Sequence, residues 1–344
     1  MRLLVTGGAG FIGSHFIRWW QARHRADELI NFDLLTYAGS RDRLADVEHQ
    51  PRYQFIHGDI GDGPTARRAI EGADLIVHFA AQTHVDRSIT DAAPFLRTNI
   101  EGTYILLQAA LGAGRTRFIH ISTDEVYGPI LEGAVDERGV FAPHSPYAVS
   151  KAAGDLLVQA FHETYGLSTV IVRPTNIYGP GQFPEKFIPL CITNAIDGLP
   201  IPVYGDGQQR RAWLFVTDLC AALETLIAQG QPGERYNVAG GTECANLETA
   251  KMIVARMQCG AERIHLVEDR PGHDRRYAMT DHKLRGLGWQ PQVSFEQGLV
   301  DTIAWYREHR SWWQPLVQSL REDPYHWLNR AARPGAVQPS RPVR

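Results

Sequence analysis

The sequence predicts an α/β protein, with a doubly wound parallel sheet and a smaller mixed lobe toward the C-terminus. Through the first half of the 344 residues, short apolar runs alternate with helical patterns. Alternation of this kind produces parallel strands with helices on both faces of the sheet. From about residue 175, Pro and Gly become frequent, which indicates that loops carry more of the chain there.

The elements follow from the pattern in chain order. Apolar runs typical of buried strands occupy residues 3–5, 29–32, 53–56, 75–79, 118–121 and 169–172. Helical patterns occupy residues 11–23, 95–112 and 148–165, and later 186–197, 217–229, 246–258 and 295–309.

We expect three regions along the chain. Residues 1–175 form the first domain, and later segments near 214–240 return to it, with a strand at 235–238. Residues 176–330 form the smaller lobe over the carboxyl edge of the sheet. Residues 331–344 contain Pro, Arg and Gly with little apolar content, and are expected to be a flexible tail.

Composition narrows the classes of function. A formal net charge of −3 gives no indication of nucleic-acid binding. No apolar run approaches the roughly 18 residues that a membrane span needs. The first residues already have the pattern of a strand, so we expect no signal peptide. The four cysteines lack metal-ligand spacing, so we expect free thiols, no metal site and a cytoplasmic protein.

A glycine cluster between the first strand and the first helix predicts a dinucleotide site of the Rossmann type. Gly7, Gly10 and Gly13 would permit a tight turn and let phosphate oxygens approach backbone N–H groups at a helix N-terminus. Asp33 ends the second strand, where a carboxylate accepts hydrogen bonds from ribose and favours NAD over NADP. The alternatives are an ordinary Gly-rich turn and a turn-capping aspartate. The other residues expected at the cofactor are Phe11, Ile12, Asp59, Ile60, Ala80, Ala81 and Thr98, with Tyr147 and Lys151.

Two further motifs contain polar side chains that are candidates for catalysis. Tyr147 and Lys151 are four residues apart, so they share one helix face, and a nearby ammonium would lower the pKa of the phenol. Thr123, Asp124 and Glu125 directly follow the strand at 118–121, at the edge where ligands bind in such folds. An alcohol dehydrogenase needs Thr123 and the Tyr/Lys pair only, so the two acids indicate additional proton chemistry. The alternative is that Asp124 caps a turn and Glu125 is solvated.

Together these motifs resemble the extended short-chain dehydrogenases and, more narrowly, the dTDP-glucose 4,6-dehydratases, from residue 1 to about 310. Matching stretches include residues 35–39, 84–89, 178–180, 183–186, 204–207 and 269–274. The acid pair after Thr123 and the Arg-Pro-Gly-His-Asp run at 270–274 separate dehydratases from epimerases of the same fold.

The resemblance implies a chemical cycle on dTDP-glucose with NAD as a retained cofactor. Tyr147, with Lys151 and Thr123, would take the proton of the 4-hydroxyl while hydride leaves C4. Glu125 would then remove the C5 proton, and Asp124 would protonate the C6 hydroxyl as water leaves. Return of the hydride to C6 gives dTDP-4-keto-6-deoxyglucose without net redox change.

The resemblance also implies a nucleotide-sugar site in the second lobe. A guanidinium fork suits phosphate oxygens, so Arg211 and Arg270 are candidate partners of the diphosphate. The full set of expected substrate residues is His84, Asn176, Glu185, Lys186, Tyr204, Arg211, Asn246, Arg270 and His273. Each could instead be a surface charge or a loop hydrogen bond.

The chain departs from the family pattern at three places. Ala212 follows Arg211 where an acidic residue is usual, Ile177 replaces an Asn, and Gln82-Thr83 replaces Glu-Ser. The first change puts the orientation of Arg211 in question.

Other functions stay open at this point. They are the same dehydration of another nucleotide sugar such as UDP-glucose, a 4-epimerase on the same fold, and a catalytically silent NAD-binding scaffold. The resemblance also implies a homodimer, in which the helices at 95–112 and 148–165 pair as a four-helix bundle; the alternative is that these helices pack only on their own sheet.

Overall fold

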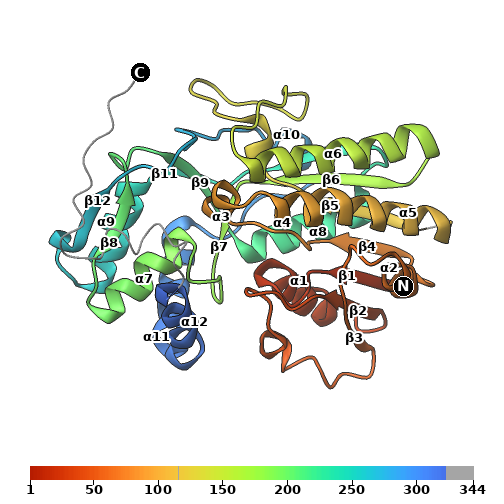
Figure 1. The fold of residues 1–344 in the computed structure, drawn as a ribbon, viewed down its shortest axis with the longest axis horizontal. Helices are drawn as coiled ribbons and strands as arrows, with labels where there is room; N and C mark the ends of the chain where they lie inside the picture. The colour runs from red at the N-terminus through yellow and green to blue at the C-terminus, as the bar shows by residue number, and fades with distance from the viewer. Residues whose placement is uncertain (115, 323–344) are drawn as a thin grey trace.

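A computed structural model describes residues 1–114 and 116–322, so the predicted tail lies outside the described residues. Its largest element is a seven-stranded, all-parallel sheet with strand order β10-β6-β5-β4-β1-β2-β3 (Figure 1). The strands are β1 (Arg2–Thr6), β2 (Glu28–Asp33), β3 (Tyr53–His57), β4 (Leu75–His78), β5 (Arg117–Ile121), β6 (Thr169–Pro174) and β10 (Glu234–Val238).

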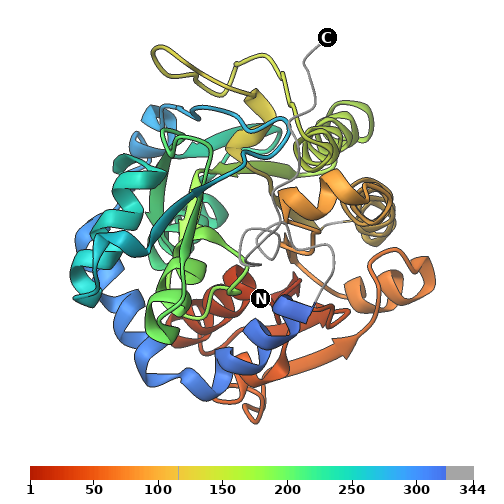
Figure 2. The same cartoon turned by 60° about the vertical axis from the view of Figure 1, so that its left-hand side comes forward.

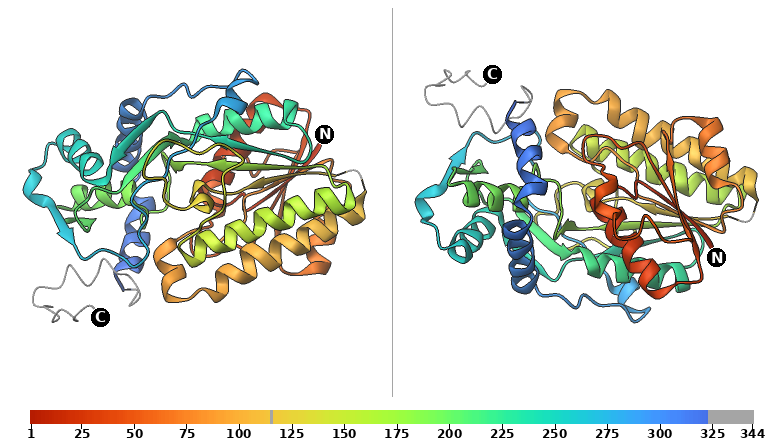
Figure 3. Two further views of the ribbon diagram at one scale, coloured as in Figure 1. Left: turned by 90° about the horizontal axis from the view of Figure 1, so that it is seen from above. Right: turned by 90° about the horizontal axis from the view of Figure 1, so that it is seen from below.

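Helices cover both faces of this sheet because its strands are apolar on both sides. Leu3 and Val5 pack into one core cluster, and Leu4, between them, packs into the other. One face carries α1 (Phe11–Arg23) and α8 (Val216–Gln229). The opposite face carries α2 (Gly63–Ile70), α5 (Thr103–Ala113) and α6 (Pro146–Tyr165), as the views from above and below show (Figure 3).

The smaller lobe is built from two further sheets and a group of helices (Figure 2). Strands β11 (Thr242–Ala245), β9 (Arg210–Phe215) and β7 (Asn176–Tyr178) form one sheet, and β12 (Ile264–Val267) and β8 (Ile201–Tyr204) the other. The helices around them are α7 (Phe187–Asp197), α9 (Asn246–Met257), α11 (Phe295–Glu308) and α12 (Arg310–Glu322). Their apolar faces meet in a third core cluster that includes Tyr178 and Trp313.

Short elements complete the part of the chain that is described. They are η1 (Arg41–Leu44), α3 (Val85–Thr90), α4 (Ala93–Phe95), η2 (Leu96–Gly102), η3 (Asp124–Tyr127), η4 (Ala261–Arg263) and α10 (His282–Arg285). Within the described ranges, no helix is both long and apolar enough to cross a membrane.

The fold class is as predicted, with one local correction. The helix expected over 95–112 is not uniform, because residues Leu96–Gly102 form a π-helical segment before α5 begins. π-helical turns occur mostly as single insertions, frequently at functional sites. Thr98, an expected cofactor residue, lies in this segment.

The strand order places a crevice at a defined position. β1 pairs with β2 on one side and with β4 on the other, so the connections run in opposite directions from this point. In open parallel sheets, ligands bind beyond the carboxyl ends of the strands where the order reverses. The glycine cluster follows β1 at this point.

Candidate active site

Two adjoining cavities lie at the carboxyl edge of the large sheet. The first has a volume of about 310 Å³ and the second about 170 Å³. Glu125, Asn176, Glu185 and Lys186 line both cavities, so these side chains form a shared wall.

Every residue predicted for the cofactor lines the first cavity. They are Gly7, Gly10, Phe11, Ile12, Gly13, Asp33, Asp59, Ile60, Ala80, Ala81, Thr98, Tyr147 and Lys151. Gly7 has φ +71°, and a Cβ there would lie 2.6 Å from the Ala80 backbone nitrogen. A Cβ on Gly13 would lie 2.4 Å from the Gly7 carbonyl oxygen. The turn therefore requires glycine at both positions.

Asp33 caps a loop at the edge of the first cavity. Its Oδ2 accepts a hydrogen bond from the Ala9 backbone N–H at 2.9 Å, and Oδ1 accepts one from Leu35 N–H at 2.8 Å. The carboxylate therefore caps its own loop while lining the first cavity. Burial raises the pKa of Asp33, and these two hydrogen bonds oppose the rise.

The expected catalytic side chains converge on the first cavity from two elements. Thr123 caps η3 after β5, with its Oγ1 accepting from Glu125 N–H at 3.3 Å and donating to Asp124 Oδ1 at 3.2 Å. Tyr147 and Lys151 lie on α6, which begins where the Ser145 side chain accepts from the Ala148 N–H. All five expected catalytic residues are buried and line this cavity.

The electrostatics of the Tyr147–Lys151 pair differ from the sequence expectation. Burial, followed by the charge of Glu125, raises the pKa of Tyr147 instead of lowering it. Lys151 is itself desolvated, which lowers its pKa to about 8, and its Nζ donates to the Ile121 carbonyl oxygen at 2.6 Å. The expectation was wrong because the spacing of two residues on a helix face indicates only that an ammonium and a phenol share that face. It does not indicate that both groups are buried or that carboxylates lie nearby.

The two acids after Thr123 occupy different environments. Burial and the charge of Glu125 raise the pKa of Asp124 to about 7. Asp124 Oδ2 is buried and has no protein partner. Burial also raises the pKa of Glu125, and the charges of Arg270, Arg211 and Lys186 oppose the rise. Two carboxyl groups in different environments can divide acid and base work between them.

Every residue predicted for the substrate lines the second cavity. They are His84, Asn176, Glu185, Lys186, Tyr204, Arg211, Asn246, Arg270 and His273. The Oδ1 atoms of Asn176 and Asn246 are buried without a protein partner. Because buried amide oxygens are normally hydrogen-bonded, these atoms point to ligand donors. Lys186 Nζ donates to the Thr83 carbonyl oxygen at 2.8 Å.

Arg211 is held in place although Ala212 lacks the usual acid. Its Nη2 donates to the Asp274 carbonyl oxygen at 3.0 Å, and its guanidinium lies 4.4 Å from the ring centre of Tyr277. Ala212 stands opposite Glu243 in the antiparallel register of β9 and β11.

The other departures from the family pattern lie at the cavities. Ile177 lines both cavities, and its buried side chain joins a core cluster. Gln82 lines the first cavity, and Thr83 lines both.

Several residues of this site carried no predicted role. Asp86 and Tyr277 line the second cavity, and the Tyr277 hydroxyl lies 2.9 Å from Asp274 Oδ2 and 3.4 Å from Glu125 Oε2. Tyr37 donates to Glu185 Oε1 at 2.6 Å. Tyr37 and Asp86 fall within stretches that match the family, and that match was the only available signal.

No metal centre accompanies these groups in the described part of the chain, where no three His, Cys, Asp or Glu side chains are grouped to hold an ion. All four cysteines are free thiols, and Cys191 and Cys220 are buried.

The sequence of this chain is similar to those of known nucleotide-sugar 4,6-dehydratases. The family model described as GDP-mannose 4,6 dehydratase matches residues 4–302. A dTDP-glucose 4,6-dehydratase from Streptomyces niveus is 50% identical over 321 residues, which cover 92% of this chain and 96% of the relative.

Solved structures agree with the sequence relatives. The crystal structure of a dTDP-glucose 4,6-dehydratase from Streptomyces venezuelae, solved with NAD bound, has a TM-score of 0.90 at 50% identity and covers 92% of this chain and 100% of its own. A UDP-glucose 4-epimerase from Thermus thermophilus, also in complex with NAD, has a TM-score of 0.83 at 30% identity, over 90% of this chain and 100% of its own. The fold is thus common to dehydratases and epimerases.

Proposed function

Because this chain belongs to the nucleotide-sugar 4,6-dehydratase family, we propose that it converts dTDP-glucose into dTDP-4-keto-6-deoxyglucose with NAD as its cofactor. The observation that carries this proposal is the convergence of Asp124, Glu125 and Tyr147 on one cavity beside the glycine turn. Relatives that are 50% and 46% identical over more than nine tenths of the chain carry the same activity in their names.

The cofactor residues fit NAD. The glycine turn leaves room for phosphates, and Asp33 presents a carboxylate held by two backbone donors to the same cavity. NAD, when bound, accepts a hydride from C4 and gives it back to C6. Tyr147 takes the proton of the 4-hydroxyl, and Thr123 orients the hydroxyl. Because burial raises the pKa of Tyr147, this role requires the positive charge of Lys151 and that of oxidised nicotinamide beside the phenol.

The two acids then carry out the elimination. The C4 ketone acidifies the C5–H, so Glu125, whose carboxylate faces three cationic side chains, acts as the base. Asp124 has a pKa near neutrality and a free buried oxygen, so it donates a proton to the C6 hydroxyl as water leaves. A simple epimerase has no need for this pair.

The nucleotide diphosphate occupies the second cavity in this proposal. Arg211 and Arg270 supply the guanidinium groups for phosphate oxygens. Asn246, whose Oδ1 lacks a protein partner, meets a donor on the nucleotide. Glu185 and Lys186, on the shared wall, contact the sugar.

A labelling experiment tests this function against its alternatives. The protein is incubated separately with dTDP-glucose, UDP-glucose and GDP-mannose that carry deuterium at C4. We expect a 4-keto-6-deoxy product from dTDP-glucose, with the deuterium at C6 of the same molecule. Preferred turnover of UDP-glucose or GDP-mannose would mean that dTDP-glucose is not the substrate. A C4-epimerised product would mean that the reaction is an epimerisation and not a dehydration. No turnover of any of the three would favour a catalytically silent scaffold.

We further propose a homodimer through α5 and α6. Exposed apolar side chains lie on or just before these helices: Leu96, Tyr104, Val149 and Leu156 are 44–57% exposed. Large apolar side chains that are exposed on neighbouring helices are typical of association sites. Leu156→Arg should convert a dimer to a monomer in sedimentation velocity, and Val140→Arg, at an exposed loop position, should not. A monomeric wild-type protein would contradict the dimer.

The proposal also covers the division of the chain into domains and the location of the protein in the cell. In this proposal residues 1–175 form the NAD-binding domain and the nucleotide-sugar lobe begins at residue 176. The segments near 214–240 that return to the first domain are α8 and β10. Free thiols, which are typical of reducing compartments, support a cytoplasmic location.

A further inference from the structure

The short helix α3 joins the expected oxidation site to the expected diphosphate site. It follows β4 and packs on α6, and the His84 side chain caps its first turn. Ser88 on this helix accepts a hydrogen bond from the Tyr147 backbone N–H at 3.2 Å and donates to the Val85 carbonyl oxygen at 2.6 Å. Val85, Phe95 and Tyr147 form a small buried apolar cluster beside this contact.

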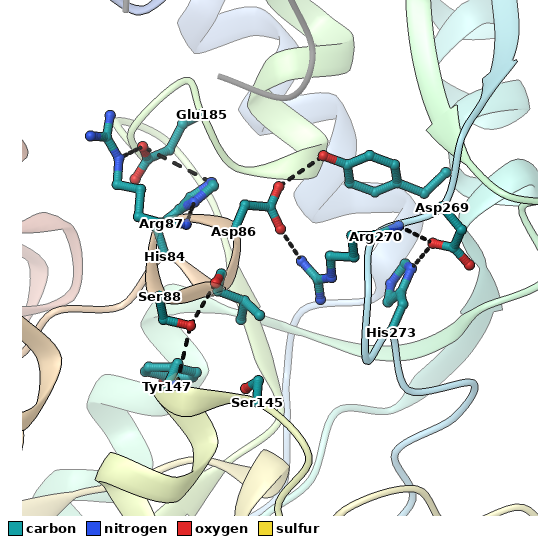
Figure 4. A network of polar contacts seen from close by, with 12 residues as sticks. His84, Asp86, Arg87, Ser88, Ser145, Tyr147, Glu185, Asp269, Arg270 and His273 are labelled. Atoms are coloured by element: carbon teal, nitrogen blue, oxygen red, sulfur yellow. Dashed lines mark hydrogen bonds and ion pairs between the residues drawn. The ribbon is translucent and has the colours of Figure 1, made fainter. Parts of the chain in front are cut away.

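Asp86 lies on the same helix and reaches into the second cavity (Figure 4). Its Oδ1 accepts from Arg270 Nη1 at 2.7 Å, and its Oδ2 accepts from the Tyr204 hydroxyl at 2.8 Å. The Asp86 residue is only 8% exposed. Burial alone would raise the pKa of this carboxyl, but the charge of Arg270 and the two hydrogen bonds hold it below its ordinary value.

Arg270 is fixed on one side and open on the other. Its backbone N–H donates to Asp269 Oδ1 at 2.9 Å, and the same oxygen lies 2.6 Å from His273 Nδ1. The side chain is 15% exposed, and its Nε is buried without a protein partner. A guanidinium that has donors to spare in a buried cavity is suited to an anionic ligand.

A carboxylate in this position needs an explanation. A cavity built only to attract a diphosphate would gain nothing from a buried negative charge against its arginine, because the carboxylate repels the ligand. A buried ion pair also contributes little net stability relative to apolar side chains of similar size. The contact does, however, restrict a long and flexible guanidinium to one orientation, so that less conformational entropy is lost when a ligand binds.

We propose that Asp86 is a positioning residue that fixes Arg270 and Tyr204 for the sugar diphosphate, and that α3 thereby sets where the hexose lies relative to Tyr147. This inference rests on the proposed function. It assigns Asp86 no contact with the reacting atoms: the carboxylate acts through Arg270, and Ser88 transmits the placement of the same helix to the start of α6.

A binding cycle on the NAD-loaded protein tests the inference. The dissociation constants of dTDP and thymidine are measured by calorimetry for the wild type, Asp86→Asn, Arg270→Gln and the double variant. We expect Asp86→Asn to weaken dTDP roughly tenfold and to leave thymidine unchanged. In the Arg270→Gln background, Asp86→Asn should have almost no further effect. Asp91→Asn, an exposed carboxylate just after α3, is the matched control and should bind dTDP as the wild type does.

Three outcomes would overturn the inference. Unchanged or tighter dTDP binding by Asp86→Asn would mean that the carboxylate does not orient Arg270. An equal loss for dTDP and thymidine would indicate general loosening of the cavity. Additive losses in the double variant would mean that the two residues act independently.

A second variant tests the same inference in case the first one misfolds. If Asp86→Asn does not fold, Tyr204→Phe removes one hydrogen bond from the same carboxylate and should weaken dTDP several-fold with thymidine unchanged; no change would equally overturn the inference. Turnover of dTDP-glucose by the wild type is recorded in parallel. Its absence would refute the proposed function, whereas normal turnover with an unaltered dTDP affinity in the variants would refute only the role of Asp86.

Discussion

Asp124 and Glu125 are neighbours in the chain, and the charge of Glu125 helps to raise the pKa of Asp124 to about 7. Burial and this charge therefore allow Asp124 to keep a proton near neutral pH. This is the arrangement that an acid and a base need when they act on adjacent carbon atoms of one sugar.

The pH dependence of elimination should follow this proton. Below about 7, Asp124 holds the proton and can donate it to the leaving hydroxyl; above about 7 it is a carboxylate and cannot. The elimination rate should therefore fall about tenfold per pH unit above about 7. It should also fall on the acid side, where Glu125, whose pKa burial raises, takes up a proton and can no longer act as the base. Oxidation at C4, followed by the absorbance of reduced nicotinamide, should persist until Lys151 loses its charge at a pH of about 8. Parallel profiles for both steps would contradict these assignments.

Asp124→Asn should separate oxidation from dehydration. The amide keeps the size of the side chain but cannot donate the proton, so product formation should fall by about 10²–10⁴-fold, while reduced cofactor still forms on the protein. Single-turnover absorbance together with product analysis measures both. Asp136→Asn, at an exposed loop position, is the matched control. Full dehydratase activity in Asp124→Asn would favour the epimerase alternative.

Tyr147→Phe should stop the first step. Without the hydroxyl, no group on α6 can take the proton of the 4-hydroxyl, and the rate of cofactor reduction should fall by about 10²–10⁴-fold. Affinity for dTDP, measured by calorimetry, should not change, because Tyr147 lines only the first cavity. Reduction at the wild-type rate would show that another residue is the base.

Tyr37→Phe should loosen the cofactor. The Tyr37 hydroxyl donates to Glu185 at 2.6 Å, and this bond ties the loop after β2 to the segment before α7, both of which contribute residues to the lining of the first cavity. A hydrogen bond to a charged group contributes about 1.5–3 kcal/mol, so NAD release should become roughly tenfold faster.

The readouts are NAD retained after gel filtration and deuterium that crosses between two substrate molecules. Tyr53→Phe, which removes a hydroxyl that accepts from Asn31, is the control. Retention equal to that of the wild type would mean that the Tyr37–Glu185 contact does not hold the cofactor.

Local patterns predicted the parts of the site that are local in the chain. The glycine turn, the Thr123 run and the Tyr147–Lys151 spacing each lie within a few residues, and all of them line the cavities as expected. The Asp86–Arg270 contact joins positions 184 residues apart, and the contact of Tyr37 with Glu185 spans 148. Neither hydrophobic periodicity nor residue spacing can predict such contacts, because they depend on how the two lobes pack against each other.

Burial explains the remaining differences. The sign of the pKa shift of Tyr147 depends on the desolvation of a helix face, which residue spacing does not encode. Ala212 stands opposite Glu243 on the neighbouring strand, but Glu243 pairs with Arg210 and Arg276. Arg211 is held instead by the Asp274 carbonyl oxygen and the ring of Tyr277, contacts from a distant segment that a linear motif does not include.

Glu125, Asn176, Glu185 and Lys186 separate the two cavities and belong to both. A sugar nucleotide seated in the second cavity would therefore block one side of the coenzyme, and its departure would expose that side again. We therefore expect the coenzyme to enter first and to leave last. The hydride must return to the sugar before the product dissociates. A wall shared by the two cavities would favour this order of events.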